Sequence, residues 1–586
     1  MKRTHLPMLI LAASLATACG DDGGAAAETA DTSGTEDASD TADTSDTADT
    51  SDTADTSDTA DTSDTTDTSD TGEDPTPFQQ AVEALGGARA LAGLELLQID
   101  STGTRAFDYE GETPGGVVEV STYTTSYAFD LTNHDIRVDT ERTPLFEALQ
   151  FFPPSNFSVV VNGDVGGISP QVGFIPPGPT ASQYVGALRN QQRFFNPHFI
   201  LRDGLADPTL IGDGGEEEFD GRAHRIITFA GDIAEVRLFV DAETGSISKL
   251  ETLENHVLTR DTDLEVHYLA WQSRGALAFP DVVELYVGGE LVHGETRDAV
   301  VIEPRLADDA FELPPEAVDA TADPNALEFG EQTHHVVDAF FNLGSFYPEE
   351  SAITPTQLAP GVTAMLVPGA ANSLVVSYDQ GLVVFEAPGT PAHGSNLIDA
   401  IAAEYPAMPI THIVQSHFHQ DHASGVRSFI AEETTLVVGE GVGDFWQGIL
   451  AAESTIRPDA LAGANVTPVI EELALDDTLV IDDPNVTITI HHISTNPHSE
   501  DMVIGLIDVD GQRFVYEADL YNAGLGLTAV IGGPESLFEN LRTLGIIDTD
   551  CSSDVPLTIV PAHGVPQTLQ VSLAELAGQT IDVDCN

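Results

Sequence analysis

The stretch that most restricts the fold of this chain is THIVQSHFHQDHASG, residues 411–425. It places His417, His419, Asp421 and His422 within six consecutive residues, directly after the strand-like run THIVQS. Imidazole and carboxylate groups at this density are typical ligands of zinc, which accepts nitrogen and oxygen donors. His417 and His419 can project toward one point, and Asp421 and His422 toward a second point beside it. Six residues cannot complete the coordination shells of two ions, so we expect further ligands from downstream loops at the same sheet edge.

Three later residues meet that requirement, because each follows an apolar, strand-like run. His498 follows VTITIHHIS, Asp519 ends QRFVYEAD and His563 ends PLTIVPAHG. The ends of such strands can converge on one edge of a sandwich of sheets. The pattern therefore predicts a metal site whose ligands are His417, His419, Asp421, His422, His498, Asp519 and His563.

Residues 353–586 mix short apolar strands with amphipathic helices. Strand-like runs such as NSLVVSYDQ and GLVVFEAPG alternate with helical patterns such as SNLIDAIAAEYP and ESLFENLRTLGI. This alternation predicts a layered α/β domain with sheets inside and helices outside.

With these residues in place, the C-terminal two-fifths of the chain resembles a metallo-β-lactamase-fold hydrolase, an αββα sandwich with a two-metal site. The resemblance implies two zinc ions per chain, each with three ligands of its own and one bridging carboxylate between them. The first set is His417, His419 and His498, the second is Asp421, His422 and His563, and the bridge is Asp519.

The resemblance also implies an enzyme, in which two zinc ions lower the pKa of a shared water and give a hydroxide nucleophile. Asp421 is the expected catalytic residue because it would orient that nucleophile. Glu386 is expected in a supporting role, at a position where many family members have aspartate, and Ser499 and Asp501 are further supporting candidates. The expected substrate is a small molecule with an ester, thioester, lactone, amide or phosphodiester bond.

The resemblance leaves alternatives to that reaction. Zinc β-lactamases resemble this domain but usually have Cys or Ser where Asp519 stands, which disfavours a dedicated β-lactamase. Mononuclear iron persulfide dioxygenases of the same fold share the ligands. A third alternative is a non-catalytic ligand-binding lipoprotein in which the metallo fold is a scaffold; the complete ligand set favours the enzyme.

Residues 77–315 begin with a helical stretch, FQQAVEALGGARALAGL, and continue with runs such as AEVRLFVDAETGSISKLETL. Period-two alternation with turn formers between the runs predicts a mainly antiparallel β domain. This layout resembles the half-barrel of periplasmic lipoprotein carriers, which holds acyl chains. It implies an accessory domain that positions the enzyme or binds a lipid-like substrate. Residues 316–352, rich in Asp, Glu and Pro, are the predicted linker to the metallo domain.

Residues 1–18 have the layout of a secretory signal, with a basic start before an apolar run. The small residues before Cys19 resemble the lipobox of bacterial lipoproteins, whose cysteine is acylated, and imply a membrane anchor through an N-terminal lipid. Cys551 and Cys585 are the remaining cysteines, and we expect them to pair as one disulfide in an oxidising compartment.

Residues 19–76 are nearly all Asp, Thr, Ser, Ala and Gly, and TADTSD repeats with a six-residue period. A segment with so little apolar surface and such strong self-repulsion is expected to be a disordered tether. The formal net charge of −75 argues against nucleic acid as a partner. Together these features predict a cell-envelope protein, lipid-anchored in the periplasm or at the outer membrane of a bacterium.

Overall fold

The computed structural model describes residues 75–145, 155–170, 177–230, 234–323, 352–367, 371–475, 477–525 and 530–585. The predicted signal, nearly all of the predicted tether with Cys19, and most of the predicted linker lie outside the described residues. The described residues from Thr76 onward belong to one compact unit. Among them, no helix is long and apolar enough to cross a membrane.

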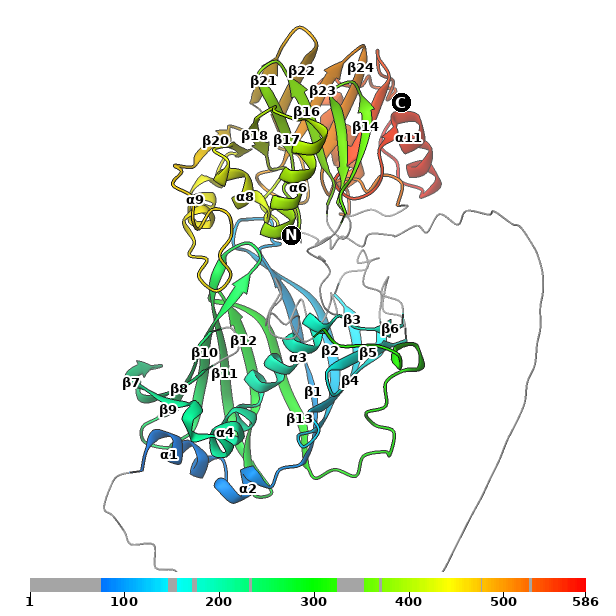
Figure 1. Cartoon of the computed structure of the whole chain (residues 1–586). Helices are drawn as coiled ribbons and strands as arrows, with labels where there is room; N and C mark the ends of the chain where they lie inside the picture. Colours follow the sequence, from blue (N-terminus) through cyan, green and yellow to red (C-terminus); the bar gives the residue numbers. More distant parts are fainter. Residues whose placement is uncertain are drawn as a thin grey trace, which may run out of the picture. The chain divides into compact units, whose positions relative to one another are not determined.

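The N-terminal half is built around an antiparallel sheet of 13 strands (Figure 1). Its strands are β1 (Leu96–Asp108), β2 (Val117–Asp130), β3 (Asp135–Pro144), β4 (Ser155–Asn162), β5 (Val165–Ser169), β6 (Gly178–Pro179), β7 (Ile211–Phe219), β8 (Arg222–Phe229), β9 (Val236–Asp241), β10 (Ile247–His256), β11 (Arg260–Arg274), β12 (Leu277–Val287) and β13 (Glu290–Ile302). The order is β6 to β1 and then β13 to β7, so neighbouring strands in the sheet are consecutive in sequence except β1 and β13, and β6 and β7 form the two edges. The predicted mainly antiparallel domain is confirmed.

The helices of this half are α1 (Pro77–Ala84), α2 (Ala88–Ala92), α3 (Ser182–Phe195) and α4 (Pro197–Ala206), with 3-10 turns at Pro208–Leu210 and Pro315–Ala317. The helical stretch expected at the start of the domain is divided into α1 and α2. Gly86 and Gly87 interrupt it with φ angles of 120° and 90°, which favour glycine. A Cβ at Gly86 would also lie 2.1 Å from the carbonyl oxygen of Ala276, so the interruption is fixed by packing.

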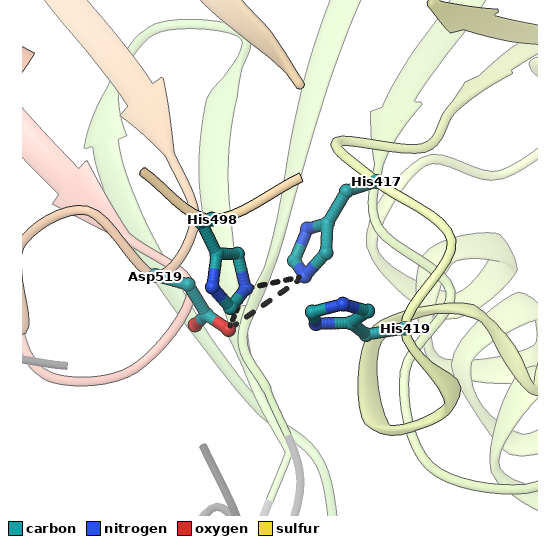
Figure 2. A group of neighbouring side chains, drawn as sticks. All are labelled: His417, His419, His498 and Asp519. Carbon is teal, nitrogen blue, oxygen red and sulfur yellow. Dashed lines mark hydrogen bonds and ion pairs between the residues drawn. The ribbon is translucent and has the colours of Figure 1, made fainter. Parts of the chain in front are cut away.

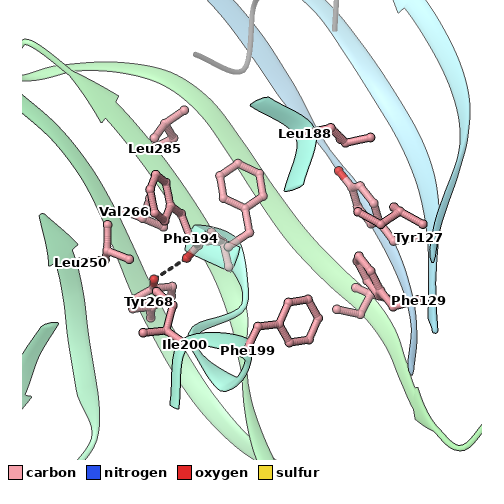
Figure 3. Close-up of a cluster of buried hydrophobic side chains, with 14 of the residues drawn as sticks. Tyr127, Phe129, Leu188, Phe194, Phe199, Ile200, Leu250, Val266, Tyr268 and Leu285 are labelled. Atoms are coloured by element: carbon pink, nitrogen blue, oxygen red, sulfur yellow. Dashed lines mark hydrogen bonds between the residues drawn. The ribbon is translucent and has the colours of Figure 1, made fainter. Parts of the chain in front are cut away.

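Helices α3 and α4, which the sequence patterns do not predict, supply the centre of the N-terminal core (Figure 3). Leu188 and Phe199 from these helices are buried together with Tyr127 of β2 and Leu250 of β10. The Tyr268 hydroxyl of β11 donates a hydrogen bond to the carbonyl oxygen of Phe194, which ties α3 to the sheet. One face of the sheet is therefore covered by apolar helix side chains.

The C-terminal half contains two smaller sheets (Figure 1). The first has β14 (Thr354–Ala359), β15 (Val362–Leu366), β16 (Ser373–Tyr378), β17 (Gly381–Phe385), β18 (Ile410–Val414), β19 (Thr435–Gly439) and β20 (Val469–Leu473). The second has β21 (Thr478–Asp482), β22 (Val486–His492), β23 (Val503–Val509), β24 (Gln512–Glu517), β25 (Leu557–Pro561) and β26 (Gln567–Thr568). Strands β17 to β20 run parallel, as do β24 and β25, and the other pairs are antiparallel.

Helices cover the outer faces of these two sheets: α6 (Pro391–Glu404), α7 (Gln420–Ala423), α8 (Val426–Ala431), α9 (Gly443–Ala451), α10 (Gly533–Thr543) and α11 (Leu569–Gly578). One apolar core, with Phe385 and Ile488, lies between the sheets. A second packs the first sheet against α6, α8 and α9, and a third packs the second sheet against α10 and α11. This is the predicted αββα arrangement. A disulfide joins Cys551 to Cys585 beside the third core.

Candidate metal centre

Loops that follow strands of the two C-terminal sheets bring four buried donor side chains together (Figure 2). Two of them follow β18, one lies between β22 and β23, and one follows β24. Their potential ligand atoms all lie within 4.8 Å of one another. We call them the first donor group: His417, His419, His498 and Asp519.

The spacing inside the first donor group suits a shared cation. His417 Nε2 and His498 Nε2 lie 3.1 Å apart. Asp519 Oδ2 lies 3.1 Å from His498 Nε2 and 3.6 Å from His417 Nε2. A tetrahedral zinc ion with ligands about 2.1 Å away holds those ligands about 3.4 Å from one another. The observed distances fall on both sides of that value.

Three further side chains form a second donor group beside the first: Asp421, His422 and His563. His563 Nε2 lies 3.1 Å from His422 Nε2 and 3.4 Å from Asp421 Oδ2. Asp519 also contacts this group, since its Oδ2 is 3.1 Å from His422 Nε2 and its Oδ1 is 3.3 Å from His563 Nε2. All seven residues expected to be ligands therefore lie in two adjoining groups that share Asp519.

The local backbone explains how short segments aim so many donors at one place. Strand β18 lies between β17 and β19, so the chain leaves the middle of the sheet after Val414. Helix α7 begins directly after His419, and its single turn carries Asp421 and His422. Asp519 has a φ of 63°, a left-handed conformation that aspartate tolerates better than most residues and that turns the chain at the end of β24.

Burial and neighbouring charges set the protonation of the donors. Burial, together with the surrounding imidazoles, holds the pKa values of His417 and His419 well below the usual range, so both are neutral with a lone pair to offer. Burial would lower the pKa of His422, but Asp421 and Asp519 outweigh it and raise that pKa well above its usual range. Burial opposes ionisation of Asp519, yet His422 and His563 hold its pKa well below its usual value.

The carboxylate of Asp421 tests whether these residues fit a metal. Both of its oxygens are buried, and among the described residues no side chain donates a hydrogen bond to either. The nearest imidazole nitrogens, of His563 and His422, lie 3.4 and 3.5 Å from Oδ2. A buried carboxylate without a hydrogen bond is costly, and a metal ion held between these groups would offset that cost. Because imidazole and carboxylate groups are suitable ligands for zinc and similar divalent ions, the donor set fits a metal centre.

Glu386 lies behind the second donor group. Its Oε1 is 3.6 Å from His422 Nδ1, and Gln415 donates a hydrogen bond to its other oxygen. Burial raises the pKa of this carboxyl group. A carboxylate on the far nitrogen of a ligand histidine fixes the orientation of the ring. Ser499 donates a hydrogen bond to Asp501, and burial raises the pKa of Asp501 to about 7.

Two residues at this site belong to the N-terminal half and have no motif to reveal them. The carbonyl oxygen of Gly111 accepts a hydrogen bond of 2.8 Å from His419 Nε2. Glu110 Oε2 lies 3.4 Å from the other ring nitrogen of His419, Nδ1. Both residues lie between β1 and β2, and Gly111 precedes His419 by 308 positions. No spacing or composition signal in the sequence connects them to the histidines.

A comparison with protein families identifies the class of the C-terminal part. Residues 366–504 match the model of the Metallo-beta-lactamase superfamily. The matched range contains the HFHQDH stretch and His498, whereas Asp519 and His563 lie beyond it. The C-terminal part of the chain therefore carries a metallo-β-lactamase domain, as its sequence predicts.

Solved structures similar to this chain include metallo-β-lactamases and a LolA superfamily protein. A metallo-β-lactamase from Hirschia baltica is 15% identical, covering 38% of this chain and 96% of its own, with a TM-score of 0.27. One from Cronobacter sakazakii is 18% identical, covering 37% and 81%, with a TM-score of 0.27. A LolA superfamily protein from Nitrosomonas europaea is 12% identical, covering 40% and 95%, with a TM-score of 0.25. A comparison with curated proteins finds no match.

Proposed function

We propose that the C-terminal domain is a metal-dependent hydrolase with two metal ions. The observation that carries this proposal is the position of Asp519 between the two donor groups. Its Oδ2 lies 3.1 Å from both His498 Nε2 and His422 Nε2, and its Oδ1 lies 3.3 Å from His563 Nε2. A carboxylate shared in this way suits two ions about 3.5 to 4 Å apart. A single structural ion would not need the second donor group.

When bound, such ions act as Lewis acids that lower the pKa of water and stabilise a developing oxyanion. The chain's own residues do the rest. Buried, neutral His417 and His419 offer lone pairs, and Asp519 stays ionised at neutral pH because its pKa is low. Asp421, whose Oδ2 is 3.4 Å from His563 Nε2, is placed to orient a nucleophile and to hold its proton.

The proposed ions are zinc, and the proposed substrates are small molecules with an ester, thioester, lactone, amide or phosphodiester bond. Zinc β-lactamases usually have Cys or Ser at the position of Asp519. Asp519 therefore supports these substrates over those of a dedicated β-lactamase. We further propose secretion to the cell envelope and anchoring through a lipid on Cys19. The basic, apolar and small-residue pattern of residues 1–19 supports that location.

The experiment that tests the proposed function combines metal analysis with a substrate panel. The purified mature chain is assayed for bound metal by mass spectrometry, and for hydrolysis of ester, lactone, phosphodiester and cephalosporin substrates before and after chelation. His563→Ala should lower both metal content and turnover. His412→Ala is the matched control, because His412 is a half-buried histidine of β18 outside both donor groups. Fewer than one metal ion per chain and no metal-dependent turnover would favour the scaffold alternative.

A second candidate function, ligand binding by the β domain, is supported by a cavity of about 380 Å³ in the N-terminal half. Phe129, Leu131 and Phe199 give it apolar walls, and Arg189 and Arg202 line it as well. Asp130, Asp135 and Asp203 line it too, so the lining suits a small amphipathic ligand with a polar end. Equilibrium binding of a fluorescent fatty acid to the mature chain tests this candidate, and retained binding in Phe199→Ala and Arg202→Ala variants would count against this cavity.

A further inference from the structure

The loop between β1 and β2 carries residues of the β domain to the candidate metal centre. Glu110 and Gly111, both in this loop, are fully or almost fully buried. Glu110 Oε2 lies 3.4 Å from His419 Nδ1, and the Gly111 carbonyl oxygen lies 2.8 Å from His419 Nε2. Both ring nitrogens of His419 therefore face two consecutive residues from the other half of the chain, and Nε2 is hydrogen-bonded to one of them.

The contact with Gly111 decides which nitrogen of His419 can bind a metal. A backbone carbonyl only accepts hydrogen bonds, so Nε2 must carry the proton. A histidine that binds a metal through one ring nitrogen donates the N–H of the other to a carbonyl or carboxylate, and here that donor is Nε2. Nδ1 therefore presents a lone pair, and it is Nδ1 that faces Glu110.

With a metal ion on Nδ1, a carboxylate oxygen 3.4 Å from that nitrogen lies at the spacing of a second ligand. Two ligands of one tetrahedral zinc ion are about 3.4 Å apart. The same spacing, 3.1 to 3.6 Å, separates His417 and His498 from each other and from Asp519. We infer that Glu110 is a further ligand of the metal ion held by the first donor group, so that the β domain completes the metal centre.

Contacts on both sides of Glu110 fix its position. The backbone N–H of Glu500, close to His498, donates a hydrogen bond of 3.0 Å to the carbonyl oxygen of Glu112. The ring of Tyr109 packs against that of Phe445 in α9, with centroids 6.3 Å apart. Glu110 therefore lies between two anchored neighbours, which is the preorganisation that a metal ligand requires.

A second set of contacts away from the loop supports the same arrangement. The Asp261 carboxylate accepts hydrogen bonds from the backbone N–H groups of Thr455, at 2.7 Å, and Ile456, at 3.2 Å. Arg260, which is completely buried, donates to the carbonyl oxygen of Arg457 at 3.2 Å. Because these contacts join β11 to the segment after α9, the β1–β2 loop does not hold the two halves together alone.

The inference rests on the metal binding proposed above, and its test separates the two. Glu110→Gln and the control Glu112→Gln are made in the full mature chain; Glu112 is exposed, so its variant removes the same charge from the same loop without touching the site. The affinity for Zn²⁺ is measured by competition with a chelating indicator, and the coordination of Co²⁺ by its visible absorption. Thermal unfolding confirms that each variant is folded.

Glu110→Gln should weaken binding of one metal ion about 10-fold to 100-fold, as loss of a metal-site partner typically does, and should alter the Co²⁺ spectrum. Glu110→Asp should recover part of the affinity, because a carboxylate is retained, and Glu112→Gln should match the wild type. Wild-type affinity and an unchanged Co²⁺ spectrum in Glu110→Gln would overturn the inference while leaving the proposed function intact. A wild-type chain that binds no metal would instead overturn the proposed function.

Discussion

Asp519 and His422 are 97 positions apart in sequence, yet Asp519 Oδ2 lies 3.1 Å from His422 Nε2. This contact links the two donor groups, because the same oxygen also lies 3.1 Å from His498 Nε2. The charges match the geometry: the low pKa of Asp519 and the high pKa of His422 each depend partly on the other residue. Without the carboxylate, two clusters of buried imidazoles would have no shared anion.

Replacing Asp519 with asparagine should therefore uncouple the two donor groups. We expect loss of at least one metal ion and a fall in kcat/KM of about 100-fold or more, as for removal of a residue that acts in the transition state. Asp510→Asn is a matched control. Asp510 also has a left-handed backbone, with a φ of 49° compared with 63° for Asp519, but it is exposed in a turn. Equal metal content and turnover in Asp519→Asn and the control would contradict a bridging role.

The seven donors could be predicted because each signal is local. HFHQDH follows one apolar strand, and His498, Asp519 and His563 each follow or end another. Strand ends in a layered α/β fold meet at a sheet edge, so sequence order alone is enough to place the donors together. Their distances, and the division of Asp519 between the groups, depend on packing and could not be derived this way.

Glu110 could not be predicted for the opposite reason. Its proximity to His419 depends on how the two halves of the chain pack, and the loop around it has no spacing that marks a ligand.

Helix α3 could not be predicted because polar residues interrupt its apolar positions in SQYVGALRNQQRFF. Helices in proteins owe most of their stability to tertiary packing, and α3 packs Val185 and Leu188 on the sheet.

The packing of α3 can be tested by removing a side chain from its core face. Leu188 is 3% exposed and lies in the N-terminal core (Figure 3). Leu188→Ala should reduce the free energy of unfolding of the β domain by about 2 to 5 kcal/mol, because it leaves a cavity. Urea denaturation measures the change. Leu269→Ala, at a 43% exposed position of β11 in the same domain, should change it by less than about 0.5 kcal/mol. Similar losses in both variants would argue against α3 as a core helix.

Glu295 of β13 should make the β domain sensitive to acid. Burial opposes its ionisation, but His293 and Arg297 outweigh burial and lower the pKa of Glu295 to about 2, from an ordinary value of 4.5. The stability it contributes is therefore present above pH 4.5 and is lost as the pH falls toward 2. Glu295→Gln should cost about 3 kcal/mol at pH 7, since it leaves the buried Arg297 without its carboxylate.

The pH profile separates this charge effect from a simple packing defect. The difference in unfolding free energy between wild type and Glu295→Gln should shrink as the pH is lowered from 5 toward 2. Glu290→Gln, an exposed change on the same strand, should behave as wild type at every pH. A difference that stayed constant across this range would indicate that charge is not the cause.

The disulfide between Cys551 and Cys585 should stabilise the metallo domain. It closes a loop with a sequence separation of 34, for which chain entropy suggests a contribution of about 3 to 4 kcal/mol. A double Cys→Ser variant should lower the midpoint of urea unfolding for the C-terminal domain and leave that of the β domain unchanged. If neither reductant nor the double substitution lowered the midpoint of urea unfolding of the C-terminal domain, the bond would contribute little.

Anomalous X-ray diffraction from crystals grown with zinc tests the central claim most directly. We expect two anomalous peaks about 3.5 to 4 Å apart, one on each side of the Asp519 carboxylate, with the first within coordination distance of His417, His419 and His498. A single peak in either donor group, or no peak near Asp519, would contradict a two-metal centre.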